Sequence, residues 1–175
     1  GLDYLMNENM TLTAGYGFIR TFPYGEQPLP ETFDEHRIWQ TLTINQSGKW
    51  ANLSHRYRLE QRWLERFSTD ELGGYMYLNR IRYRILINKA IKLNNEPTKW
   101  FATLSNEVFI GFGKNVAKNV VDQNRLAITL GYKFKQNTNL QIGYMNQTVL
   151  KRDGIKQEQN GTLTMAITYN MDWRN

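Results

Sequence analysis

Polar and apolar residues alternate at every second position through most of this chain. The pattern is clearest in two neighbouring stretches, 55–67 and 79–87, where arginines occupy the even positions and mainly aromatic or aliphatic residues the odd ones. Successive side chains of a β-strand point to opposite faces, so each stretch predicts a strand with one charged and one apolar face.

The same alternation predicts eight full strands, a ninth partial strand at the start, and no helix. The expected strands cover residues 1–6, 10–20, 37–45, 50–67, 75–92, 100–112, 124–134, 140–149 and 162–173. Short turns at 7–9, 46–48, 93–99 and 136–139 take turns with longer polar loops at 23–35, 68–74, 113–122 and 151–160. Sequential hairpins with alternately short and long connections are typical of an up-and-down transmembrane β-barrel.

Strand length separates a membrane barrel from a soluble fold. A tilted strand crosses a bilayer in about 9–11 residues, whereas strands of globular proteins average about 5–6. Most of the expected strands have the longer length, which disfavours a soluble sandwich or lipocalin-like barrel. No apolar run suits a membrane helix. We therefore expect an all-β, antiparallel up-and-down transmembrane β-barrel that forms one domain over residues 1–175.

The order of short and long connections also predicts orientation. If the short turns are periplasmic, the last strand ends in the periplasm and the fragment at 1–6 descends from the extracellular side. Such barrels have an even number of strands, so we expect that N-terminal strands are lacking here and that the complete barrel has about ten or twelve.

Charge and cysteine content narrow the partners. The 175-residue chain carries a net charge of +6 and has no cysteine, which excludes a disulfide scaffold and suits an oxidising envelope compartment. Positive charge favours lipid headgroups, lipopolysaccharide or nucleic acid. Proteins that bind single-stranded nucleic acid interleave basic and aromatic residues. By alternation we expect the arginines to share a face with no aromatics, and we therefore expect no nucleic-acid partner.

Aromatic residues near the predicted strand ends suggest interfacial girdles of the kind that flank the lipid-facing band of a barrel. The alternative is that aromatic residues are simply common in strands. The candidates are Trp63, Trp100, Tyr132, Phe134 and Trp173.

If the apolar faces meet lipid, the charged faces line the lumen. The candidate lumen residues are Arg37, Arg56, Arg58, Glu60, Arg62, Arg80, Arg82, Arg84, Glu107 and Arg125, with Lys133 and Asp172 also on this face. The two arginine runs should be neighbours, and adjacent guanidinium groups repel unless carboxylates or an anion lie between them. In one interpretation Glu60 and Glu107 bridge the arginines and plug the lumen. In the other, an arginine ladder binds or conducts anions.

Catalysis has little support in the sequence. Ser54 and His55 are consecutive in a strand and point to opposite faces, which excludes a hydrolytic pair. His36, beside Asp34 and Glu35 in a predicted loop, could form one corner of a lipid-modifying site, although a solvated acidic loop explains it better. No spacing of ligands suggests a metal. We expect a protein that is not an enzyme and that has no cofactor and no metal.

Several motifs together resemble a known family. They are YGEQPLPETFDEHRIWQ (24–40), HRYRLEQRW (55–63), RIRYR (80–84), NEVFI (106–110), DQNRLAITLGYKF (122–134) and LQIGYMNQ (140–147). From about residue 12 to the C-terminus the chain resembles the Bacteroidota outer-membrane barrels catalogued as domain of unknown function 2490. The resemblance implies a barrel with further upstream strands, often rich in acidic residues. It implies no activity.

The expected function is therefore that of a structural or accessory subunit in the bacterial outer membrane, with its lumen largely plugged. Its expected partners are outer-membrane lipid and lipopolysaccharide, the barrel-insertion machinery during biogenesis, and other outer-membrane proteins. The alternatives are a narrow channel or binder for anions and, more weakly, a lipid-modifying barrel enzyme.

Overall fold

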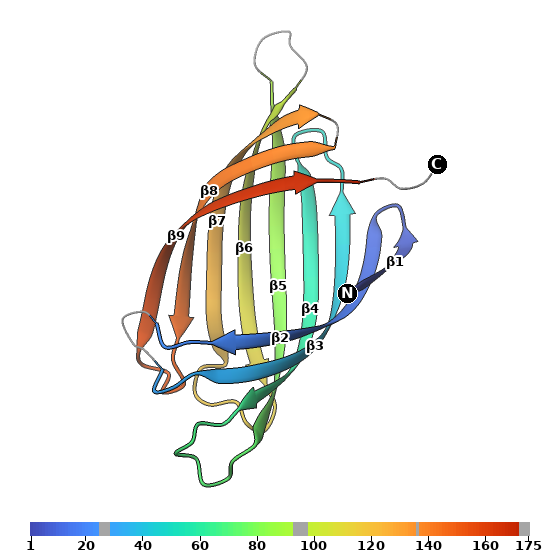
Figure 1. The fold of residues 1–175 in the computed structure, drawn as a ribbon. Helices are drawn as coiled ribbons and strands as arrows, with labels where there is room; N and C mark the ends of the chain where they lie inside the picture. Colours follow the sequence, from blue (N-terminus) through green and yellow to red (C-terminus); the bar gives the residue numbers. More distant parts are fainter. Residues whose placement is uncertain (25–28, 93–97, 136, 172–175) are drawn as a thin grey trace.

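The protein is a single antiparallel sheet of nine strands that pair in sequence order, from β1 to β9 (Figure 1). The computed structural model describes residues 1–24, 29–92, 98–135 and 137–171. The strands are β1 (Leu2–Asn7), β2 (Met10–Thr21), β3 (Phe33–Gln46), β4 (Asn52–Glu65), β5 (Tyr75–Ile91), β6 (Trp100–Phe112), β7 (Val121–Lys135), β8 (Thr138–Leu150) and β9 (Gln157–Tyr169). Within these ranges the chain contains no helix long and apolar enough to cross a membrane.

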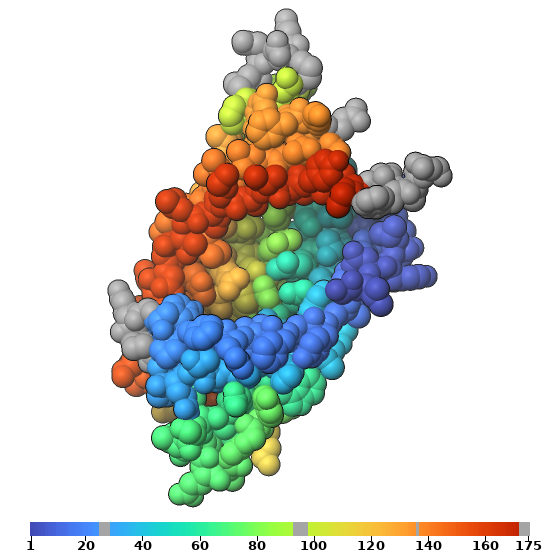
Figure 2. Space-filling model, in the orientation of Figure 1, coloured from blue at the N-terminus to red at the C-terminus, as the bar shows by residue number. Residues whose placement is uncertain are grey.

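The sheet is strongly curled, so that β9 at one edge faces β1 and β2 at the other (Figure 1). Figure 2 shows an opening between β9 and β2, with the inner surface of the middle strands behind it. The predicted up-and-down antiparallel topology is confirmed, but β1 and β9 are not paired with each other in the described part of the chain. The described strands number nine, an odd number, so β1 and β9 run in the same direction.

Four strands begin earlier than the sequence predicted. One of them, β8, begins at Thr138, inside the expected short turn at 136–139. The other three begin inside expected long loops, β3 at Phe33, β7 at Val121 and β9 at Gln157. Prolines and charged residues made these segments resemble loops, yet their backbones continue the ladder: Glu35 lies opposite Ile19 on β2 and Leu64 on β4. The correction matters because the extended strand ends carry acidic side chains.

The distribution of polarity is the reverse of that in a soluble domain. Among the described residues only Phe101 and Phe109 are buried apolar side chains, whereas the buried polar set is Glu35, Thr41, Glu60, Arg80, Arg82, Thr103, Glu107 and Glu158. Long apolar side chains of nearly every strand are exposed on the outer, convex face, among them Ile128, at 59%. The sheet therefore buries charge inside and presents hydrocarbon outside.

Aromatic rings on the inner face lie over glycines of the neighbouring strand. A Cβ built on Gly131 of β7 would overlap the Phe101 ring of β6, and one built on Gly15 of β2 would overlap the indole of Trp39 on β3. Glycine leaves room for a large ring to lie flat against the wall. These contacts explain why Phe101 is buried although most residues of the inner face are polar.

Candidate functional site

The charged inner face is built by the register of β3 to β7. Arg56 lies opposite Arg84 and Arg58 opposite Arg82, so the arginine runs of β4 and β5 lie side by side, as expected from the sequence. Directly opposed side chains in an antiparallel pair have Cβ atoms about 4.5–5.5 Å apart. At that spacing guanidinium groups need anionic partners between them.

Glu60 on β4 is the centre of these interactions. Its side chain is fully buried, and Arg80 donates to Oε2 through Nε at 2.8 Å and Nη2 at 2.7 Å. Arg82 donates to Oε1 at 2.8 Å, while Arg37 and Arg58 lie 3.5 and 3.9 Å from the same oxygen. One carboxylate is thereby surrounded by four arginines from three strands.

Glu35 and Glu107 form further ion pairs with arginines on the inner face, on either side of Glu60. Arg62 binds Glu35 in a bidentate manner at 2.7 and 2.8 Å, and Arg37 reaches it at 2.6 Å. Glu107 Oε1 accepts from Arg56 at 2.6 Å and from Arg82 at 2.8 Å. Because Arg37 and Arg82 each contact Glu60 as well, the pairs are continuous. We call Glu35, Arg37, Arg56, Glu60, Arg62, Arg80, Arg82, Glu107 and Asp122 the inner-face network.

Phe109 fills the space beside the network. This side chain of β6 is 1% exposed, and the guanidinium carbons of Arg82, Arg80 and Arg125 lie 4.3, 5.0 and 5.0 Å from its ring centroid. The guanidinium carbon of Arg58 lies over the ring of Trp39 in the same way, 4.0 Å from its centroid. The statement that the arginines share their face with no aromatics is therefore wrong. These rings are covered by guanidinium groups, so they do not form an open surface on which bases could stack.

Asp122 enters the network through a β-bulge. The ladder between β6 and β7 shifts after Phe109, which pairs with Gln123, while Ile110 pairs with Val121. A bulge re-aims the extra residue, and Asp122 Oδ2 lies 3.5 Å from Arg80 Nη1. Its other carboxylate oxygen is buried and makes no hydrogen bond within the described structure.

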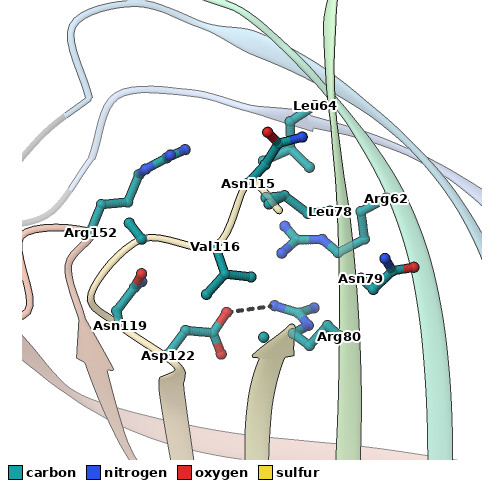
Figure 3. Close-up of a pocket in the computed structure, with 12 residues that line it drawn as sticks. Arg62, Leu64, Leu78, Asn79, Arg80, Asn115, Val116, Asn119, Asp122 and Arg152 are labelled. Atoms are coloured by element: carbon teal, nitrogen blue, oxygen red, sulfur yellow. Dashed lines mark ion pairs between the residues drawn. The ribbon is translucent and has the colours of Figure 1, made fainter. Parts of the chain in front are cut away.

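The loop between β6 and β7 covers the network at the long-loop rim. Asn115 donates to the carbonyl of Tyr77 at 2.9 Å, and Asn119 donates to the carbonyl of Leu150 at 3.0 Å, so the loop reaches from β5 to β8. Beneath it is a cavity of about 160 Å³ whose walls include Arg62, Arg80 and Asp122. Figure 3 shows these side chains converging below the loop that carries Val116.

Positive charge exceeds negative charge in this region. In the middle of β3 to β7 the inner face carries Arg37, Arg56, Arg58, Arg62, Arg80, Arg82, Arg84 and Arg125 against Glu35, Glu60, Glu107 and Asp122. Lys133 and Glu158 are further charges of this face, outside its middle part. Within the described structure neither Arg84 nor Arg125 forms an ion pair. The buried Nε atoms of Arg56 and Arg84 have no hydrogen-bond partner there. A buried donor without an acceptor costs about 1–3 kcal/mol, so part of the network is incompletely satisfied.

Four of the five candidate girdle residues lie on the outer face near the rims. Trp100, Tyr132 and Phe134 form one group at the short-turn rim, with ring centroids 4.9 and 5.1 Å apart. Trp63 packs on Tyr77 at 5.2 Å toward the other rim. Trp173 and the candidate lumen acid Asp172 lie outside the described residues.

The suggested corner of an active site does not assemble. Glu35 is buried inside with Arg37 and Arg62, whereas His36, the next residue of β3, is on the outer face. His36 Nδ1 lies 2.7 Å from the hydroxyl of Tyr16 and its ring packs on Phe18. Among the described residues no group of three or more potential metal ligands occurs.

Sequence reasoning missed two acids of the network, Glu35 and Asp122, because it placed both in loops. For Glu35 a signal was available: it continues the inner-face alternation of Arg37 backwards by one step. Asp122 had no such signal, because strict alternation from Arg125 would turn an even-numbered residue outward, and only the bulge brings it in.

Fold and site together define a curled antiparallel sheet with an apolar outer face and a charged, largely ion-paired inner face. The chain belongs to the family described as protein of unknown function (DUF2490), whose pattern matches residues 1–159. The match begins before the residue 12 expected from the motifs and ends before the C-terminus. No curated protein and no solved structure matches the chain.

Proposed function

We propose that this protein is a structural barrel of the bacterial outer membrane whose lumen is closed by the inner-face network. The observation that carries the proposal is the reversed polarity: charge is buried inside, while the outer face exposes long apolar side chains. Exposed apolar surface on this scale is unfavourable in water and favourable in lipid.

Two features support a closed lumen. The continuous ion pairs extend over the inner surface of β3, β4, β5 and β6, and Glu60 and Phe109 within this surface are shielded from solvent. The loop between β6 and β7 covers the same region from the long-loop rim. A barrel of this kind serves as a scaffold or accessory subunit, held in lipid and near lipopolysaccharide by its apolar outer face.

The membrane location imposes a condition on the free edges of β1 and β9. Unpaired backbone N–H and C=O groups are too costly in the hydrocarbon core, so a spanning sheet has to be closed. The two edges run in the same direction, and direct pairing would be parallel. An all-antiparallel closure needs an odd number of additional strands between them, which agrees with the even strand numbers of such barrels.

The proposal is tested with the full-length protein in planar bilayers and vesicles. We expect folding into vesicles and no steady current at moderate voltage, because the network blocks the lumen. Failure to insert into lipid would refute the membrane barrel.

A second candidate is an anion-selective channel, which the excess of arginine over carboxylate favours. A steady current with a reversal potential toward chloride in a salt gradient would replace the plugged scaffold by this channel. In that case replacing Arg82, which links Glu60 and Glu107, should change the selectivity.

A further inference from the structure

We infer that the inner face holds a binding site for a tetrahedral oxyanion, on the short-turn side of the inner-face network. Its residues form one rung across four strands, in which Arg56, Arg84, Glu107 and Arg125 lie opposite one another in turn. We call these four residues the arginine rung. The inference rests on the proposed closed lumen, since the inner-face network would close the site on the side away from the short turns.

The rung lacks negative charge. Its one carboxylate, Glu107, accepts from Arg56 and from Arg82 of the next rung through the same oxygen. Arg84 lies between Arg56 and Glu107 in the register yet forms no ion pair within the described residues. Arg125 donates to an amide: with its oxygen turned inward, Gln123 accepts from Arg125 Nη2 at 2.9 Å and from Arg125 Nε at 2.5 Å.

Unused donors mark where the anion would sit. Nε of Arg56 and Nε of Arg84 are both buried and have no acceptor in the described structure. The planar donor groups of arginine match pairs of oxygen atoms on phosphate or sulfate, and several arginines together suit a doubly charged anion. Chloride, a single atom with one charge, cannot match the paired N–H groups of a guanidinium with two separate acceptor atoms.

The short-turn side offers a polar approach to this rung. Ser54 and Leu86 follow Arg56 and Arg84 toward that rim, and both line a cavity of about 440 Å³. The other walls of this cavity include Asn45, Asn88 and Lys133. Among the described residues that line this cavity, Lys133 is the one with a charge. Its positive charge favours the entry of anions from this end.

The cavity at the other rim is the weaker candidate. There Arg62 already binds Glu35 in a bidentate manner, and Arg80 is paired with Glu60 and Asp122. These two arginines are engaged, and the Asp122 carboxylate would repel an anion. The arginine rung, with unpaired guanidinium groups, is the site we assign.

Isothermal titration of the full-length protein in a non-ionic maltoside detergent with inorganic phosphate tests the site. We expect saturable binding in roughly the millimolar range or tighter, at least about tenfold weaker in Arg84→Gln and partly restored in Arg84→Lys. Arg84 has no ion pair to lose, so Arg84→Gln should fold. Arg20→Gln, which changes an exposed arginine paired with Asp34, is the control and should bind like the unmodified protein.

A parallel titration with glycerol phosphate distinguishes the source of the ligand. Binding of both compounds indicates the terminal phosphate group of a larger ligand, whereas binding of inorganic phosphate alone indicates the free ion. Absence of saturable binding, or equal binding by Arg84→Gln, would overturn the site. Conductance of the same preparation tests the closed lumen separately from the binding site. A protein that conducts ions and also binds phosphate would refute the closed lumen and leave the binding site supported.

Discussion

Glu60 is the residue on which the stability of the inner face depends most. Its carboxylate is fully buried and lies within 4.0 Å of four arginines. Glu60→Gln keeps the shape of the side chain but removes the charge that separates these arginines. Breaking a buried ion pair by removing one partner costs about 3–5 kcal/mol, so we expect a loss of this size in the free energy of unfolding, measured by urea titration in vesicles.

The matched control is Glu71→Gln, which makes the same chemical change at an exposed loop position. Substitutions of this kind usually change stability by less than about 0.5 kcal/mol. Equal stability of the two variants would show that the arginines do not depend on Glu60 and that the network is not a structural plug.

Residue-level chemistry was the part of the site that sequence patterns predicted best. Alternation placed Glu60, Glu107 and the arginines on one face, since each lies in the middle of a long strand where the period of two is unbroken. Alternation could not show which donors remain unpaired. That depends on side-chain directions, as for Arg84, whose neighbour Glu107 is already bound by Arg56 and Arg82.

At the scale of the strands, contacts between rings and glycines fix how β6 packs beside β7. Gly131 of β7 provides the space in which the Phe101 ring lies. In Gly131→Ala the new methyl group would displace this ring, and overpacking of this kind costs about 1–3 kcal/mol. We expect a corresponding loss of stability in thermal or urea unfolding.

Gly17→Ala is the control for that experiment, because a Cβ at Gly17 would meet no atom closer than Ile19 Cδ1 at 3.8 Å. Alanine in a strand is more favourable than glycine by about 0.5–1 kcal/mol. The two alanine variants should therefore shift stability in opposite directions, and a stabilising effect of both would contradict the proposed packing of Phe101.

Elements were predicted well in number and order and less well at their ends. β6 begins and ends where alternation placed it, from Trp100 to Phe112. β3 and β9 extend further into segments that seemed to be loops, since proline and charged residues there gave local signals for turns while the ladder with neighbouring strands overrode them. The bulge at Asp122 likewise depends on pairing between strands.

At the scale of the whole molecule, the reversed polarity makes a prediction that separates lipid from water as the surroundings of the outer face. Ile128 lies near the middle of β7 on that face and is 59% exposed. In a lipid-facing position Ile128→Arg should cost about 2–4 kcal/mol. If the outer face met water, the same change should stay within about 0.5 kcal/mol.

The measurement is the free energy of unfolding from vesicles, with Ile155→Arg as the control. Ile155 is 82% exposed in the loop between β8 and β9, so an arginine there remains in water under either description. A large loss for Ile128→Arg beside an unchanged Ile155→Arg places the middle of the outer face in hydrocarbon. Equal and small effects would mean that the exposed side chains of β7 face water, and the membrane barrel would have to be abandoned even if phosphate binds at the arginine rung.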